Sequence, residues 1–108
     1  MKHPLITIIT VVLNDEKNIE KTILSILKQK YKNIQFIVID GGSIDGTINK
    51  IEKYIDRIDI FESKKDNGIY DAFNKGLKLA EGDLIGFVNS GDLLTANSLT
   101  ILEKYYQN

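Results

Sequence analysis

The hydrophobic pattern of the chain changes its period several times. The run from Leu5 to Leu13 is apolar at nearly every position, which is typical of a strand buried on both faces. Isoleucine and leucine then recur at helical spacing, which predicts a helix over about residues 18–30. A second buried strand follows from Ile34 to Ile39 and ends at Asp40. The first forty residues therefore predict a strand, a helix and a strand.

The same alternation continues beyond Asp40. Glycine and serine at 41–43 break the chain, and a third strand is expected near Asp59 to Glu62. Between them lies a shorter helix, marked by Ile48, Ile51 and Ile55. A turn at 66–68 then leads into a third helix, which Gly82 ends and whose apolar face consists of Ile69, Ala72, Phe73, Leu77 and Ala80.

The last two elements are a fourth strand from Leu84 to Val88 and an amphipathic helix that begins at Ser98 and carries Leu99, Leu102 and Tyr106. Strands that alternate with helices predict a mostly parallel sheet between two helical layers, with right-handed crossovers. No repeat, linker or low-complexity segment interrupts the pattern. The fold class is therefore α/β, a three-layer α/β/α sandwich in a single domain over residues 1–108.

Composition and charge limit the classes of partner that this domain is expected to bind. A net charge of −1 over 108 residues gives no basic face, so nucleic acid is excluded as an expected partner. The chain has no cysteine, and its one histidine, His3, lies in a terminal segment without a second metal ligand beside it. The apolar run after Lys2 is shorter than the about 20 residues that span a membrane and has no cleavage site. We therefore expect no transmembrane segment and a cytoplasmic location.

Polar residues follow three of the predicted strands. Asn14 and Asp15 come after the first strand, Asp40 ends the second, and the stretch Asn89 to Asp92 follows the fourth. Parallel sheets bind ligands outside the carboxyl ends of their strands, near the point where the strand order reverses. The three polar groups are therefore expected to meet at one edge and form a ligand site, although Asn, Ser, Gly and Asp are also ordinary turn residues.

Other nucleotide and phosphate motifs fit this chain poorly. A dinucleotide fold would explain Asp40, but the first turn after a strand, residues 12–18, contains no glycine to admit a pyrophosphate. No P-loop lysine motif is present. The segment 43–47 resembles an aspartate-nucleophile phosphatase motif, but its first position is Ser43. The lysine and acidic pair of a phospho-receiver domain are not evident either.

Four motifs span nearly the whole chain: ITIITVVLN at 6–14, FIVIDGGSIDGT at 36–47, DNGIYDAFNKG at 66–76 and AEGDLIGFVNSGD at 80–92. In this order and spacing they together resemble family 2 glycosyltransferases with the A-type, Rossmann-like fold. The last motif, with Asn-Ser-Gly-Asp, resembles a branch linked to exopolysaccharide synthesis. The resemblance implies transfer of a sugar from a nucleoside diphosphate to an acceptor hydroxyl with inversion.

The resemblance also implies which residues bind the donor. The end of the first strand would form the wall beside the base, Asp40 would accept a hydrogen bond from the base, and the glycines after it would let the chain pass close by. We place Asp45 as a structural residue. The expected nucleotide-binding residues are Val11, Leu13, Asn14, Asp40, Gly42, Asp66, Gly68, Asn89 and Ser90. Leu13 stands where many relatives carry an aromatic residue, so uracil, guanine and thymine all stay open as the base.

The FVNSGD motif at 87–92 departs from the Asp-x-Asp-Asp pattern that is common in the family. Asn89 and Gly91 replace two aspartates, which leaves Asp92 as the expected ligand of Mg²⁺ or Mn²⁺. Because one or two carboxylates are enough for such an ion beside a diphosphate, the resemblance still implies a divalent cation, though one held less strongly.

The acceptor side is expected outside this chain. Enzymes of the family are longer, and the resemblance places the general base and the acceptor site in a C-terminal half, so no catalytic base is assigned here. The acceptor would be a saccharide or a lipid-linked saccharide, which allows association with the inner face of the membrane. The alternative is a non-catalytic nucleotide-binding module, or one that pairs two copies through an apolar patch on the last helix, formed by Leu99, Leu102, Tyr105 and Tyr106.

Overall fold

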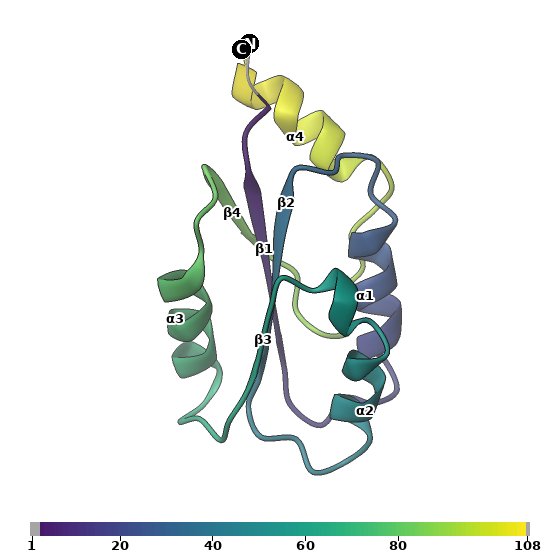
Figure 1. Ribbon diagram of the computed structural model, residues 1–108, viewed down its shortest axis with the longest axis vertical. Coiled ribbons are helices and arrows are strands. Elements are labelled where there is room, and N and C mark those ends of the chain that lie inside the picture. Colours follow the sequence, from purple (N-terminus) through teal and green to yellow (C-terminus); the bar gives the residue numbers. More distant parts are fainter. Residues whose placement is uncertain (1–2, 108) are drawn as a thin grey trace.

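A four-stranded parallel sheet forms the centre of the protein (Figure 1). The computed structural model describes residues 3–107, so the ends of the predicted domain 1–108 lie outside the described residues. The strands are β1 (Ile6–Val12), β2 (Ile34–Asp40), β3 (Ile60–Ser63) and β4 (Leu84–Phe87). Their order is β3-β2-β1-β4 and every neighbouring pair is parallel, as the alternating pattern predicts.

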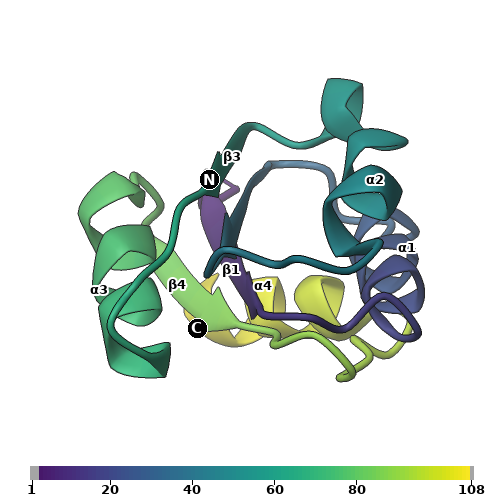
Figure 2. The same cartoon turned by 90° about the horizontal axis from the view of Figure 1, so that it is seen from below.

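Helices cover both faces of this sheet (Figure 2). α1 (Ile19–Leu27), α2 (Thr47–Glu52) and α4 (Ser98–Gln107) contribute to the core on one face, and α3 (Ile69–Leu79) packs on the other. The three-layer α/β/α prediction is therefore confirmed. Within residues 3–107, no helix has the length and apolar character needed to cross a membrane.

β1 is buried along its whole length because helices lie on both sides of it. Ile6, Ile8 and Val12 face α1, whereas Ile9 and Val11 face α3, as the alternation of side chains along a strand requires. The continuous apolar run is thus explained by two cores that share one strand.

The prediction for the second helix was wrong at its end. α2 stops at Glu52, and Ile55 lies in a separate 3-10 helix, η1 (Ile55–Arg57), where it is 43% exposed. The break allows the hydroxyl of Tyr54 to donate a hydrogen bond to Glu20 on α1. Ile58, after the break, takes the buried position that the helical spacing assigned to Ile55.

The apolar faces of α3 and α4 are less buried than their spacing predicts. In α3, Ala72 is buried, but Ile69 and Leu77 are about half exposed. Ala80 lies just beyond the helix in extended conformation. α3 is the only described helix that contributes to the core on this face of the sheet, and no described element lies on its outer side (Figure 2). In α4, Leu99 is buried, whereas the other three residues of the predicted patch are exposed: Leu102, Tyr105 and Tyr106.

The strand order reverses at β1. The chain passes from β1 to β2 and β3 on one side, and then returns to place β4 on the other side of β1. Such a reversal leaves a crevice between the outgoing connections at the carboxyl ends of the two strands concerned. The connections after β1 and β4 therefore frame the position at which a ligand is expected.

Candidate functional site

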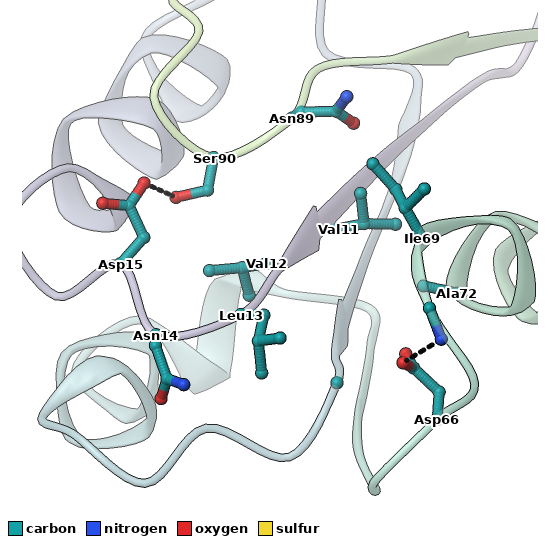
Figure 3. A pocket seen from close by; sticks show the side chains of 12 residues that line it. Val11, Val12, Leu13, Asn14, Asp15, Asp66, Ile69, Ala72, Asn89 and Ser90 are labelled. Atoms are coloured by element: carbon teal, nitrogen blue, oxygen red, sulfur yellow. Dashed lines mark hydrogen bonds between the residues drawn. The ribbon is translucent and has the colours of Figure 1, made fainter.

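A cavity of about 320 Å³ lies at this reversal point, between the carboxyl ends of β1 and β4 and the first turns of α3 (Figure 3). Its size falls within the range of small-molecule sites, about 300–1,000 Å³. Seven of the ten residues predicted from the sequence line it, namely Val11, Leu13, Asn14, Asp66, Gly68, Asn89 and Ser90. Three do not: Asp40, Gly42 and Asp92.

Asp40 is fully buried and does not line the cavity. One carboxylate oxygen, Oδ2, accepts hydrogen bonds from the amides of Gly42 and Ser43, at 3.0 and 2.8 Å, and from the Ser63 hydroxyl at 2.8 Å. The other oxygen accepts from the Ser43 hydroxyl. A carboxylate offers about four lone-pair positions, two on each oxygen. Three of these four hydrogen bonds fall on Oδ2 and one on Oδ1. Asp40 thereby fixes the 41–43 loop against β3, and a base-binding role for its Oδ1 stays a prediction.

Gly42 is required by the packing of two loops. Its φ of +95° is a left-handed conformation, and a Cβ added there would lie 2.9 Å from the Cα of Lys65. The 41–43 loop therefore passes directly against the segment that follows β3. This contact brings Asp66 next to Gly41, where an added Cβ would lie 3.0 Å from Asp66 Oδ2.

Asp66 presents a carboxylate at the edge of the cavity. Its Oδ1 accepts a hydrogen bond from the Gly68 amide at 3.1 Å, which holds the side chain at the start of α3 (Figure 3). In contrast to Asp40, Asp66 lines the cavity. A carboxylate in this position can accept a hydrogen bond from a ligand N–H group.

The end of β1 is held to the 43–44 segment by Asn14. This residue adopts a left-handed backbone, with φ of 49°, which asparagine tolerates better than most residues. Its backbone amide donates to the Ser43 hydroxyl at 2.8 Å, and its side-chain oxygen accepts from the backbone amide of Ile44 at 2.8 Å. Leu13, just before it, points toward the cavity and supplies an apolar wall (Figure 3).

Asp15 connects the loops that follow β1 and β4. One of its oxygens accepts from the Ser90 hydroxyl at 2.8 Å, and the other accepts from the Asn18 side-chain amide at 2.9 Å. Its own backbone amide donates to the Thr47 hydroxyl at 2.9 Å. That hydroxyl in turn donates to Asp45 and holds the pKa of that carboxyl below its ordinary value. Asp45 is thus part of the support of the site, as expected.

Asn89 and Ser90, with Asp15 beside them, supply polar groups on the β4 side of the cavity. Asn89 Oδ1 is buried and has no hydrogen-bond partner in the described part of the chain. Asp92 lies three residues further on, exposed, and its amide donates to the Asn89 carbonyl at 2.9 Å. Residues 3–107 contain no group of three or more His, Cys, Asp or Glu side chains that could hold a metal ion. Oxygen ligands, one of them unpartnered, nevertheless suit Mg²⁺ or Mn²⁺, which bind through few protein groups when a diphosphate supplies others.

Five further residues line the cavity that the predicted set omitted: Val12, Asp15, Gly41, Ile69 and Ala72. Asp15 could have been chosen, because it stands with Asn14 at the end of a buried strand. Ile69 and Ala72 were assigned to the apolar face of a helix, and nothing in their spacing distinguishes a cavity wall from a core.

Comparison with known proteins identifies the family. The family model of glycosyl transferase family 2 matches residues 7–108. The chain is 41% identical over 102 residues to an uncharacterised glycosyltransferase of Haemophilus influenzae, covering 92% of this chain and 41% of that protein. It is 38% identical over 100 residues to the Escherichia coli enzyme WfgD, a UDP-Glc:α-D-GlcNAc-diphosphoundecaprenol β-1,3-glucosyltransferase, covering 92% of this chain and 40% of WfgD. The chain thus spans about two fifths of the length of these curated relatives.

Solved structures agree with this match. Staphylococcus aureus TarS 1-349 in complex with UDP-GlcNAc superposes with a TM-score of 0.87 and 26% identity over 94% of this chain and 31% of TarS. A glucosyl-3-phosphoglycerate synthase of Mycobacterium tuberculosis, solved with Mn²⁺, UDP and glucosyl-3-phosphoglycerate, superposes with a TM-score of 0.67 and 25% identity over 81% of this chain and 33% of that one. The fold is the A-type glycosyltransferase fold, and the chain belongs to glycosyl transferase family 2.

Proposed function

We propose that this chain is the donor-binding half of an inverting glycosyltransferase, which moves a sugar from a nucleoside diphosphate to an acceptor hydroxyl during cell-surface polysaccharide synthesis. The observation that carries the proposal is the cavity at the carboxyl ends of β1 and β4, with apolar walls on one side and oxygen atoms on the other. The UDP-sugar complex of TarS and the name of WfgD support a nucleotide-sugar donor.

The base of the donor would lie against Val11 and Leu13, with Asp66 as the acceptor for its N–H group. Asp66 is assigned this role in place of the predicted Asp40 because Asp66 lines the cavity, whereas Asp40 is fully buried and does not line it. Asp40 and Gly42 then act on the nucleotide through the shape of the 41–43 loop. A charged acceptor strengthens such a hydrogen bond relative to a neutral one.

The diphosphate would lie toward Asn89, Ser90 and Asp92. These residues would hold Mg²⁺ or Mn²⁺ together with the phosphates, since their oxygens fit such ions. The cation, when bound, offsets the charge that develops on the departing diphosphate. The Asp15 carboxylate orients the Ser90 hydroxyl, and the Asn89 side chain presents an oxygen that the described chain leaves without a partner.

The acceptor side of the reaction belongs to the rest of such an enzyme. The chain spans 41% of its Haemophilus influenzae relative, so we expect the general base and the acceptor site in residues outside it. A saccharide or lipid-linked saccharide acceptor, used at the inner face of the membrane, is supported by the diphosphoundecaprenol substrate in the name of WfgD. This chain alone is expected to bind nucleotide weakly and to transfer little or no sugar.

Calorimetric titration with UDP, GDP and dTDP, each with and without Mn²⁺, tests the proposal. One nucleotide should bind, bind more tightly with Mn²⁺, and lose only that gain in Asp92→Ala. Asp66→Ala should weaken binding about tenfold or more with or without metal, as expected for loss of a charged hydrogen bond. Asp56→Ala, an exposed site on η1, is the matched control and should leave binding unchanged.

The outcome against the proposal is a chain that is folded by circular dichroism and binds none of the three nucleotides. That result would favour the second candidate, a module that pairs two copies. The observation that favours this candidate is the exposure of Leu102, Tyr105 and Tyr106 on α4.

A further inference from the structure

The segment that carries Asp92 has no regular secondary structure of its own. It runs from the end of β4 at Phe87 to the start of α4 at Ser98. A loop of this length would sample many conformations unless other parts of the protein fix it. The direction in which Asp92 points therefore depends on contacts made from outside the loop.

Those contacts come from three polar side chains on α1 and the turn after it. Thr22, Ser25 and Gln29 are spaced by three and four residues, which places them along one side of the helix. The Ser25 hydroxyl accepts from the Leu94 amide at 3.0 Å. The Gln29 side chain donates to the Thr95 carbonyl at 2.8 Å and accepts from the Leu99 amide at 3.3 Å. The row thus follows the loop from Gly91 to the first turn of α4.

Thr22 contacts the loop at Gly91 and at Asp92, the proposed metal ligand. Its hydroxyl accepts a hydrogen bond from the Gly91 amide at 2.9 Å and donates one to the Asp92 carbonyl at 2.8 Å. The same oxygen lies 3.4 Å from the Asn18 carbonyl, a longer contact. One side chain therefore holds the backbone on both sides of the Gly91 to Asp92 peptide, while Gly91 itself takes a φ of +96°.

The burial of Thr22 makes this contact hard to replace. Thr22 is fully buried, although Gly91 and Asp92 are exposed, so its hydroxyl finds its hydrogen-bond partners in the chain and not in water. Threonine is also a weaker helix former than the leucine or alanine that a packing position would accept. Both observations indicate that the hydroxyl is needed for the loop.

We propose that Thr22 is a positioning residue for the metal site: its hydroxyl fixes the backbone of Asp92 so that the carboxylate can bind the cation beside the donor diphosphate. The inference rests on the proposed function, because it takes Asp92 as the metal ligand. Thr22 itself touches neither ligand nor metal. It acts through Gly91 and Asp92 alone.

The test separates nucleotide affinity from its metal-dependent part. In Thr22→Val, nucleotide affinity without metal should stay within about twofold, since the residues that face the base are unchanged. The gain in affinity on adding Mn²⁺ should fall about tenfold or more, the usual effect of losing a group that orients a metal ligand. Amide hydrogen exchange at Gly91 should accelerate in the same variant.

Three further variants control for a general loss of stability. Thr22→Ser keeps the hydroxyl and should retain the Mn²⁺ gain. Ser25→Ala removes the neighbouring contact at Leu94 and should lower the melting temperature but keep the gain. Thr22→Ala replaces the valine variant if the latter does not fold, because it adds no methyl group toward the loop.

The inference is overturned if Thr22→Val, or Thr22→Ala in its place, keeps the full Mn²⁺ gain while its stability falls. In that case Thr22 serves only the fold. If the unaltered chain shows no Mn²⁺ gain, the proposed metal role of Asp92 fails and the positioning role fails with it. The two failures are distinguishable because the second is visible in the unaltered chain.

Discussion

At the scale of single residues, Thr10 is an unusual member of the core. It is fully buried on β1, and its hydroxyl has no hydrogen-bond partner in the described part of the chain. A buried hydroxyl without a partner costs about 1–3 kcal/mol. We predict that Thr10→Val, which keeps the shape and removes the hydroxyl, raises the free energy of unfolding by about 1 kcal/mol, measured by urea denaturation.

Thr7 is the matched control on the same strand. It is equally buried, but its hydroxyl donates to the Gln35 side chain at 2.7 Å and accepts from the Gly82 amide at 2.9 Å. Thr7→Val should therefore lower the free energy of unfolding, by about 1–3 kcal/mol, because it leaves the Gly82 amide unsatisfied. A lower free energy of unfolding in both variants would contradict the prediction for Thr10.

Residues at strand ends were the part of the site that the sequence could predict. Asn14 follows the buried strand β1, and Asn89 and Ser90 follow β4; parallel strands bring their carboxyl ends to one edge of the sheet. The burial of Asp40 could not be predicted in this way. It depends on Ser63, which is 23 residues away and becomes a neighbour only when β3 pairs with β2.

At the scale of elements, α3 packs on β1 through Gly76. A Cβ added to this residue would lie 2.5 Å from Ile9 Cγ2, which is closer than real contacts allow. Alanine is the better helix former by about 1 kcal/mol, but overpacking a core costs about 1–3 kcal/mol. We predict that Gly76→Ala lowers the melting temperature, measured by circular dichroism.

Asn74 provides the control for that prediction. It is exposed on the same helix, so Asn74→Ala changes helix propensity without changing the contact with β1. This variant should be neutral or slightly stabilising, by a few tenths of a kcal/mol. A stabilising Gly76→Ala would show that α3 can move away from the sheet at little cost.

The contact between α1 and the turn before η1 should make stability depend on pH. The Tyr54 hydroxyl donates to Glu20, which lowers the pKa of that carboxyl from 4.5 and raises the pKa of Tyr54 from 10.0. A lowered carboxyl pKa contributes stability that is present above the unfolded value and lost as the pH falls through the folded value. Tyr54→Phe should therefore have a lower melting temperature than the unaltered chain at pH 7.

That difference should be smaller at pH 3 than at pH 7, because the contribution of Glu20 is lost progressively as the pH falls below 4.5 and then through the lowered pKa of the folded chain. Tyr70→Phe is the control, because the Tyr70 side chain is exposed on α3. It should match the unaltered chain at both pH values. An unchanged difference for Tyr54→Phe between pH 7 and pH 3 would contradict the assigned hydrogen bond.

The elements themselves followed the sequence pattern where the pattern was long. β1 and β2 are within a residue of their predicted ends. Continuous runs rich in β-branched residues favour buried strands over helices. The short α2 was mispredicted at Ile55, since three residues at helical spacing do not reveal a turn between them. The break goes with a hydrogen bond from Tyr54 to Glu20 on α1. The local pattern of hydrophobic residues contains no information about that contact.

At the scale of the whole molecule, the described sheet ends at β4, whose outer edge is unpaired. β4 pairs only with β1 in the described sheet, and Ile85 and Phe87 on this strand are 45% and 43% exposed. The ring of Phe87 lies 4.9 Å from that of Phe73 on α3, which extends the apolar surface onto the helix. An open edge with apolar side chains tends to pair with another strand.

We therefore predict that the chain associates with itself through β4 at high concentration, measured by sedimentation velocity over a concentration series. Phe87→Lys should shift the chain toward monomer, because a charged side chain on an edge strand opposes strand pairing. Tyr105→Lys, on the exposed side of α4, tests the other surface. If it abolishes association and Phe87→Lys does not, the two copies pair through α4, as the module alternative requires. If the unaltered chain stays monomeric throughout the concentration series, the predicted association through β4 is wrong, and so is pairing through α4.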